Sequence, residues 1–276
     1  MIELRHMRWL LLGIALCLAG ALAWNSSTRD AERSASVAPK RFERALPPPP
    51  TDAAIADERR AIVASLAAAP EFAGYAERLS SAYPGDWNRL LDASALRALT
   101  SRVSEAPEAF VTEAIRGLRR NRGVVATRAG AEAMTRVFDA QAALLAALSN
   151  ADKRLCVDFM LGEINPAFLT FAATHRGLLA EMASSSLEAV ISGESQAAAP
   201  ATPTDADFDL LEAGLRQRGL DRTQIDALLD GKMPDPPISD ASLCDAGLVY
   251  FDAMKALPDD ARLRIYALAI KSLAKT

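Results

Sequence analysis

Residues 131–148 read AEAMTRVFDAQAALLAAL, and this stretch decides the fold class. Five of its side chains recur at spacings of three and four residues, and these are Met134, Val137, Gln141, Leu144 and Leu148. That spacing places them on one face of an α-helix. Because two heptads are too few for a coiled coil, we expect this helix to pack inside a helical bundle.

The composition of the whole chain also favours helix. Apolar residues make up 50% of the 276 residues, and aromatic residues only 6%. Much of the apolar fraction is alanine and leucine, which are strong helix formers, whereas the residues that favour strands are few. We therefore predict an all-α, multi-helix bundle of about ten helices over residues 51–276.

Capping residues and helix breakers divide the body into these helices. Tyr83-Pro84-Gly85-Asp86 is predicted to form a turn in which Asp86 caps the following helix. Asn121 and Gly123 are predicted to end the helix that begins at Pro107. Further starts are predicted at capping or proline residues, namely Thr51, Pro70, Asp152, Thr204, Asp221, Pro258 and either Ser239 or Asp240.

Residues 1–24 have the order of an export signal. A short head carries Arg5 and Arg8, residues 9–24 carry no charge, and Ala21-Leu22-Ala23 matches a cleavage site. The main interpretations are a cleaved signal peptide, or an anchor in the inner membrane formed by residues 9–24, with a tryptophan at each membrane interface; the remaining alternative is a buried core helix. The first two predict export of the body, so we expect a periplasmic or secreted protein.

Two further segments have the composition of linkers. Residues 25–50 have no apolar period and end in four prolines, so they cannot bury a core and are predicted to form a disordered, Pro-rich stalk. Residues 192–204 are the one stretch of the body that looks like a linker, and they are a candidate subdomain break. The predicted organisation is therefore signal or anchor over 1–24, stalk over 25–50, and helical domain over 51–276.

The charge distribution argues against a nucleic-acid partner. The chain has a formal charge of -4, and residues 1–50 hold seven Lys/Arg and four Asp/Glu, which leaves the body with 24 basic and 31 acidic residues. Nucleic-acid-binding domains usually present a basic face. We therefore expect no nucleic-acid partner.

The body contains two cysteines, Cys156 and Cys244. Each follows the pattern Asp-x-x-Leu-Cys, with Asp152 or Asp240 as the expected helix cap, and a further helix follows after a proline. Helices that start side by side would bring the two thiols together, and a disulfide persists in an exported protein. We predict a disulfide between them; the alternative is two separate buried thiols.

Five arginines form a candidate basic contact patch: Arg116, Arg119, Arg120, Arg122 and Arg128. No acidic residue lies between Glu113 and Glu132. Such a patch could contact anionic lipid headgroups or an acidic partner. The alternative is structural, because cations are favoured at a helix C-terminus, where this segment is predicted to lie.

No catalytic or metal-binding constellation stands out in the sequence. His175 is the one histidine after the N-terminal segment, so it cannot supply a zinc site, and no nucleophile motif surrounds it. The alternation of Asp205, Asp207 and Asp209 resembles the start of a calcium loop, but the later ligands of such a loop are missing. We interpret these residues instead as acids at a helix N-terminus, where the helix dipole favours negative charge. We expect no metal and no cofactor.

One dipeptide is similar to a catalytic motif of helical envelope enzymes. Glu194-Ser195 resembles the Glu-Ser of lytic transglycosylases, but the downstream Gly-Leu-Met-Gln type segment of that family is absent. We interpret Glu194 as a solvated loop residue. The expected function is a non-enzymatic envelope protein that binds or scaffolds a protein or cell-wall partner. The alternative is a helical cell-wall hydrolase or lyase that uses one acid, such as Glu163, Glu181 or Glu194.

Overall fold

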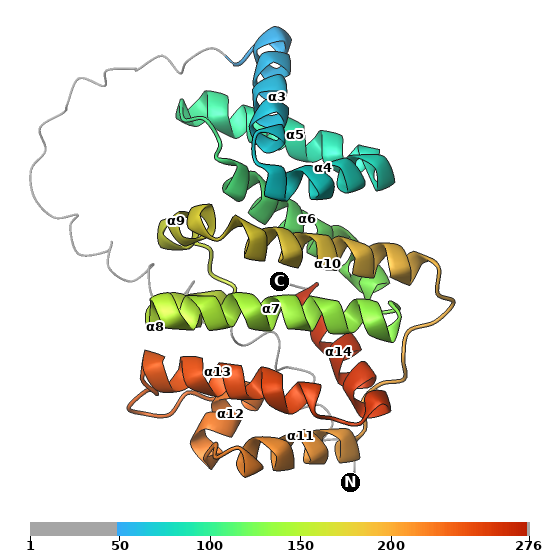
Figure 1. The fold of residues 1–276 in the computed structure, drawn as a ribbon, viewed down its shortest axis with the longest axis vertical. Coiled ribbons are helices and arrows are strands. Elements are labelled where there is room, and N and C mark those ends of the chain that lie inside the picture. Colours follow the sequence, from blue (N-terminus) through green and yellow to red (C-terminus); the bar gives the residue numbers. More distant parts are fainter. Residues whose placement is uncertain (1–48, 275–276) are drawn as a thin grey trace, which may run out of the picture.

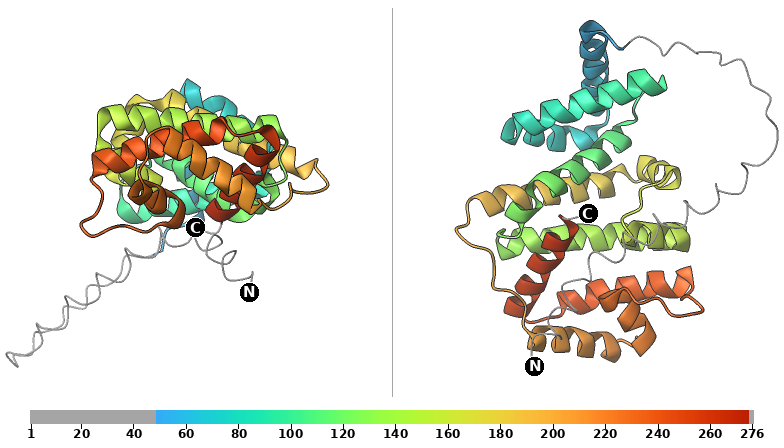
Figure 2. Two further views of the ribbon diagram at one scale, coloured as in Figure 1. Left: turned by 90° about the horizontal axis from the view of Figure 1, so that it is seen from below. Right: turned by 180° about the vertical axis from the view of Figure 1, so that it is seen from behind.

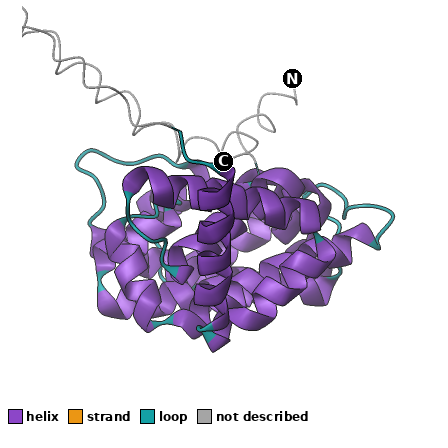
Figure 3. Ribbon diagram, turned by 90° about the horizontal axis from the view of Figure 1, so that it is seen from above, coloured by secondary structure: helices purple, strands orange, loops and turns teal. Residues whose placement is uncertain are grey.

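Every regular element that the structure describes is an α-helix. The computed structural model describes residues 49–274, and twelve helices hold 78% of that range (Figure 3). The predicted all-α bundle is confirmed, with two more helices than the sequence indicates. They are α3 (Asp52–Ala67), α4 (Pro70–Ala82), α5 (Pro84–Ser101), α6 (Pro107–Ala126), α7 (Ala131–Ala151), α8 (Lys153–Met160), α9 (Pro166–Thr174), α10 (Arg176–Glu194), α11 (Asp205–Gln217), α12 (Arg222–Asp230), α13 (Asp240–Lys255) and α14 (Asp259–Leu273).

The helices are stacked along the long axis of the molecule. In Figure 1, α3, α4 and α5 lie at the top, and α10, α7, α13 and α11 follow one below another. Helix α6 runs obliquely beneath the upper three helices and packs against α10 (Figures 1 and 2). Helix α14 contacts α7 and also α6. The C-terminal end of the described chain therefore lies near the middle of the stack.

The predicted face of residues 131–148 forms the centre of the core. Met134, Leu144 and Leu148 on α7 have no exposed surface. One continuous cluster of buried side chains includes Leu187 from α10 and Leu215 from α11, which lie on opposite sides of the loop that follows α10. The apolar stripe read from the sequence is thus the surface against which both halves of the chain pack.

Local capping follows the sequence at most helix starts. Thr51 accepts a hydrogen bond from the backbone of Ala54 at 3.2 Å, and Pro70 occupies the first turn of α4. Thr204 and Asp207 form a capping box at the start of α11. These residues satisfy backbone groups that a helix end would otherwise leave without partners.

Two predicted helix boundaries are wrong. The helix that begins at Pro107 does not end at Asn121 or Gly123 but continues to Ala126. A Cβ atom on Gly123 would lie 2.4 Å from the Cβ of Ala274, so this glycine permits the close approach of α14 and does not end α6. Asp86 does not cap α5, because Pro84 already begins that helix.

The predicted linker begins later than residue 192. Helix α10 continues through Glu194, so the loop to α11 runs over residues 195–204. The predicted signal or anchor and most of the predicted stalk lie outside the described residues. None of the helices within residues 49–274 combines the length and the apolar character that crossing a membrane requires.

Candidate binding sites

The five arginines of the candidate patch do not share one environment. Arg116 bonds to Glu113 at 3.1 Å and to the carbonyl oxygen of Gly162 at 3.3 Å. Arg120 is exposed and forms no ion pair with any residue in the described range. Because α6 continues to Ala126, the explanation by a helix C-terminus does not hold for the arginines within it.

Arg122 organises a polar cluster between three elements. Its Nε donates to Asp86 at 2.7 Å, its Nη1 donates to Glu194 at 3.3 Å, and its guanidinium lies 4.0 Å from the centre of the Tyr83 ring. Burial alone would raise the pKa of Asp86, but hydrogen bonds and charges from Arg122 and Arg89 outweigh it and lower that pKa. The cluster therefore ties the corner between α4 and α5 to α6 and to the end of α10.

Arg119 lies in a different setting from the other arginines. It lines a cavity of about 30 Å³ between α6, α7, α10 and α14, together with Gln141, Ser186 and mainly apolar residues. No described residue forms an ion pair or a side-chain hydrogen bond with its guanidinium. Burial lowers the pKa of Arg119, and the positive charge of Arg116 lowers it further. A cation thus lines a mostly apolar cavity, and no residue within 49–274 supplies a counter-charge.

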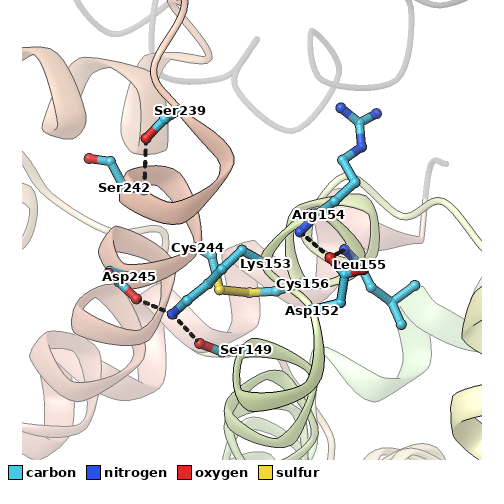
Figure 4. The surroundings of a disulfide bond; sticks show 10 residues. All are labelled: Ser149, Asp152, Lys153, Arg154, Leu155, Cys156, Ser239, Ser242, Cys244 and Asp245. Atoms are coloured by element: carbon cyan, nitrogen blue, oxygen red, sulfur yellow. Dashed lines mark hydrogen bonds and ion pairs between the residues drawn. A yellow bond between two sulfur atoms is a disulfide. The ribbon is translucent and has the colours of Figure 1, made fainter.

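The two cysteines of the body lie in disulfide geometry. Their Cα atoms are 5.8 Å apart and their sulfur atoms 2.08 Å apart, and both side chains are fully buried (Figure 4). Beside them, Lys153 of α8 bonds to Ser149 at 2.8 Å and to Asp245 of α13 at 2.6 Å. The pairing predicted from the sequence is therefore compatible with the fold.

One detail of that prediction is wrong. Asp152 caps α8 through hydrogen bonds from Arg154 and Leu155, as expected. Asp240, however, is the first residue of α13, and Ser239 takes the cap by accepting from the backbone of Ser242 at 3.3 Å. Serine and aspartate compete for this position, and a serine directly before an aspartate can move the cap by one residue.

The carboxylates considered for catalysis do not gather at one place. Glu163 and Glu181 are exposed, and neither lines the cavity at Arg119 or the pocket that lies between α3 and α5. Glu194 is exposed at the C-terminal end of α10, where it is held by Arg122 and does not stand in a loop. Glu181 and Glu194 are 13 positions apart on one helix, a rise of roughly 20 Å. These acids are therefore single surface carboxylates.

The remaining sequence candidates have structural surroundings. His175 joins α9 to α10, stacks on the ring of Phe171 at 4.0 Å, and places its Nδ1 3.0 Å from the Phe171 carbonyl oxygen. Asp205 and Asp207 occupy the first turn of α11, as interpreted from the sequence. Within residues 49–274, no three side chains of His, Cys, Asp or Glu are grouped so that they could hold a metal ion.

An open apolar groove of about 460 Å³ runs between α3 and α5. Arg59 bridges the two helices through Asp92 at 2.9 Å and Asn88 at 2.7 Å. Val63, on the α3 side of the groove, leaves 42% of its surface exposed, and Leu91 of α5 forms the floor. The sequence showed the apolar spacing of this region but not that one face of α3 would stay uncovered by the rest of residues 49–274.

Two features therefore stand out as candidate binding sites, the groove beside Val63 and the cavity at Arg119. Each is assembled from side chains of more than one helix. Compared with known proteins, the chain matches no family model, no curated protein and no solved structure.

Proposed function

We propose that this protein is a non-enzymatic helical protein of the cell envelope that binds or scaffolds a partner protein through the groove between α3 and α5. The envelope location rests on the sequence pattern of residues 1–24. The binding function rests on one observation, the apolar face of α3 beside Leu91 that no other part of residues 49–274 covers. The dispersed, exposed carboxylates favour this function over the alternative of a cell-wall hydrolase or lyase.

The shape of the groove suits a partner helix. Its α3 residues recur at the spacing of one helix face, and the positions are Ala56, Arg59, Arg60, Val63, Ala64 and Ala67. Three of them are alanines, whose small side chains let a second helix approach closely. Helices of binding partners commonly lay an apolar face into such a groove, with anchors at the same three- and four-residue spacing.

The position of α3 favours this use. It lies at one end of the stack, where it packs against α4 and α5 on one side (Figure 1). Exposed apolar side chains are common singly, but Val63 adjoins a groove that is lined largely by apolar surface. A partner would therefore cover apolar area without disturbing the rest of the bundle.

Site-specific photocrosslinking tests the proposal. A photoreactive amino acid at Val63 in the full chain, expressed in its own cells, should give a covalent adduct with one protein. Mapping by mass spectrometry should place the crosslink on the apolar face of a partner helix. Val63→Asp should remove that partner from co-purification and leave the melting temperature unchanged, because Val63 is exposed.

Ala61 provides the matched control, because it is exposed on α3 but does not line the groove. A photoreactive residue there should give no such adduct. Equal crosslinking at both positions would contradict a specific groove. An adduct of twice the chain's own mass would replace the foreign partner by a second copy. Co-sedimentation with cell-wall material that survives Val63→Asp would favour a cell-wall ligand at another surface.

A further inference from the structure

The cavity at Arg119 has the composition of a small ligand site. Arg119 comes from α6 and Gln141 from α7, and the rest of the lining is mainly apolar, with Val190 from α10 and Ile270 from α14 among its members. Gln141 is buried, and its amide makes no side-chain hydrogen bond within residues 49–274. The guanidinium of Arg119 and the amide of Gln141 therefore line the same cavity, whose other surfaces are mainly apolar.

Among residues 49–274, Arg119 has no counter-charge, which is unfavourable for a guanidinium that is partly withdrawn from water. Charges that are withdrawn from water are normally paired in proteins, because an unpaired charge loses favourable hydration. The charge that shifts the pKa of Arg119 is another positive one, Arg116, which also disfavours its charged form. A negatively charged ligand would supply the interaction that the surrounding helices do not.

We propose that this cavity binds the carboxylate of an amphiphilic monocarboxylic acid of the fatty-acid class. Arg119 would pair with the carboxylate, because a guanidinium presents two parallel donors to its two oxygens. The amide of Gln141 would donate a further hydrogen bond, and the apolar walls would contact the first carbons of the chain. This site is separate from the α3 groove and does not depend on the function proposed for it.

The dimensions and charge select this ligand class over other anions. A single unpaired guanidinium faces the cavity, which matches one negative charge better than the two charges of phosphate. The apolar lining cannot replace the hydration of a small inorganic ion. The volume of about 30 Å³ holds only the head of such a ligand, so the chain would leave through the open side, where Arg119 is still in contact with solvent.

Calorimetric titration with octanoate tests the proposal on the full protein. Octanoate should bind, whereas octanamide, the neutral analogue, and inorganic phosphate should bind at least roughly tenfold more weakly. Arg119→Gln should weaken octanoate binding by a similar factor, and Gln141→Leu by less. Both variants should keep the circular dichroism spectrum of the parent.

Arg120→Gln is the matched control, because Arg120 is the next residue on α6, is exposed and does not line the cavity. It should bind octanoate as the parent does, and so should Val63→Asp. A second readout does not involve the ligand: Arg119→Met should raise the melting temperature, since it removes a half-buried charge that has no counter-charge among residues 49–274. Absence of octanoate binding, equal binding of octanamide, or equal loss in the Arg119 and Arg120 variants would each overturn the proposal.

Discussion

Gly193 of α10 packs directly against the backbone of Val125 of α6, with no room for a side chain between them. A Cβ atom on Gly193 would lie 2.1 Å from the carbonyl oxygen of Val125 and 2.9 Å from its carbonyl carbon. These are backbone atoms within the last turn of a helix, so they cannot move aside as a flexible side chain would. The crossing of α6 and α10 is therefore possible only with glycine at this position.

Gly193→Ala should accordingly destabilise the protein. The clash has to be relieved by separating two helices, which we expect to lower the free energy of unfolding by about 1–3 kcal/mol. Urea unfolding measures it. Gly74→Ala is the control, because that glycine is exposed within α4 and a Cβ atom there meets nothing within 4 Å. It should raise the free energy of unfolding by roughly 0.5–1 kcal/mol.

Asp207 should make stability depend on acid pH. Two hydrogen bonds from Arg264, at 2.7 and 2.9 Å, lower its pKa and outweigh its burial, and Thr204 adds to the effect. A carboxyl whose folded pKa is depressed stabilises the folded state above its unfolded pKa of about 4 and loses that contribution as the pH falls below it. Asp207→Asn should therefore lower the melting temperature at neutral pH.

The difference in melting temperature between Asp207→Asn and the parent should shrink as the pH is lowered from about 5 to 2. Asp209→Asn is the control, since Asp209 is exposed in the first half of α11 and should change stability little at any pH. A difference that stays constant over this range would mean that the Arg264 pair is not the origin of the effect.

Much of the fold could be predicted because it depends on neighbouring residues. Thr51 caps α3 through a backbone group three residues away, and the stripe on residues 131–148 needs only its own spacing. The failures involve distant residues. Gly123 has the sequence context of a helix end, but its role is set by Ala274, the residue that follows α14 and packs against it. No local pattern contains that information.

The candidate sites also differ in whether the sequence alone could predict them. The pair Cys156 and Cys244 could be predicted, because the body contains no other cysteine that could compete. The Arg119 cavity could not, since four helices assemble it and the sequence places Arg119 in one row with Arg120 and Arg122. The three side chains leave the helix in different directions, and only the packing shows which of them meets a cavity.

Cys156 and Cys244 should be linked in the freshly isolated protein. Their Cα separation of 5.8 Å needs no backbone movement, and both side chains are buried. Alkylation without reductant should leave both unlabelled in mass spectrometry. Reduction should lower the free energy of unfolding by about 4–5 kcal/mol, because the bond closes a loop over a separation of 88 residues. Two labelled thiols would instead indicate separate buried cysteines.

The N-terminal segment should export the body. A phosphatase reporter fused after Pro50 should be active outside the cytoplasm, since Arg5 and Arg8 precede an uncharged run that ends in a cleavage pattern. Intact mass should show either a chain that begins at Trp24 or a full-length, membrane-bound form. A full-length protein that stays in the cytoplasm would exclude both interpretations.

Arg122 and Arg120 should differ in their effect on stability, although the sequence groups them. Arg122→Gln removes the ion pair to Asp86, whose side chain is almost completely buried and would keep only Arg89 as a charged partner. We expect the free energy of unfolding to fall by about 1–3 kcal/mol. Arg120→Gln removes an exposed charge that forms no ion pair in the described range, so its melting temperature should match that of the parent.

A double-mutant cycle connects this loss to the Asp86 pair. Combining Arg122→Gln with Asp86→Asn should cost less than the sum of the two single changes, with a coupling of about 0.5–3 kcal/mol, because the second change removes a buried charge that the first left with Arg89 as its one ion-pair partner in the described range. Thermal unfolding at neutral pH measures all four proteins. Strict additivity would show that Arg122 stabilises the corner through Tyr83 or Glu194, the other groups that its guanidinium contacts.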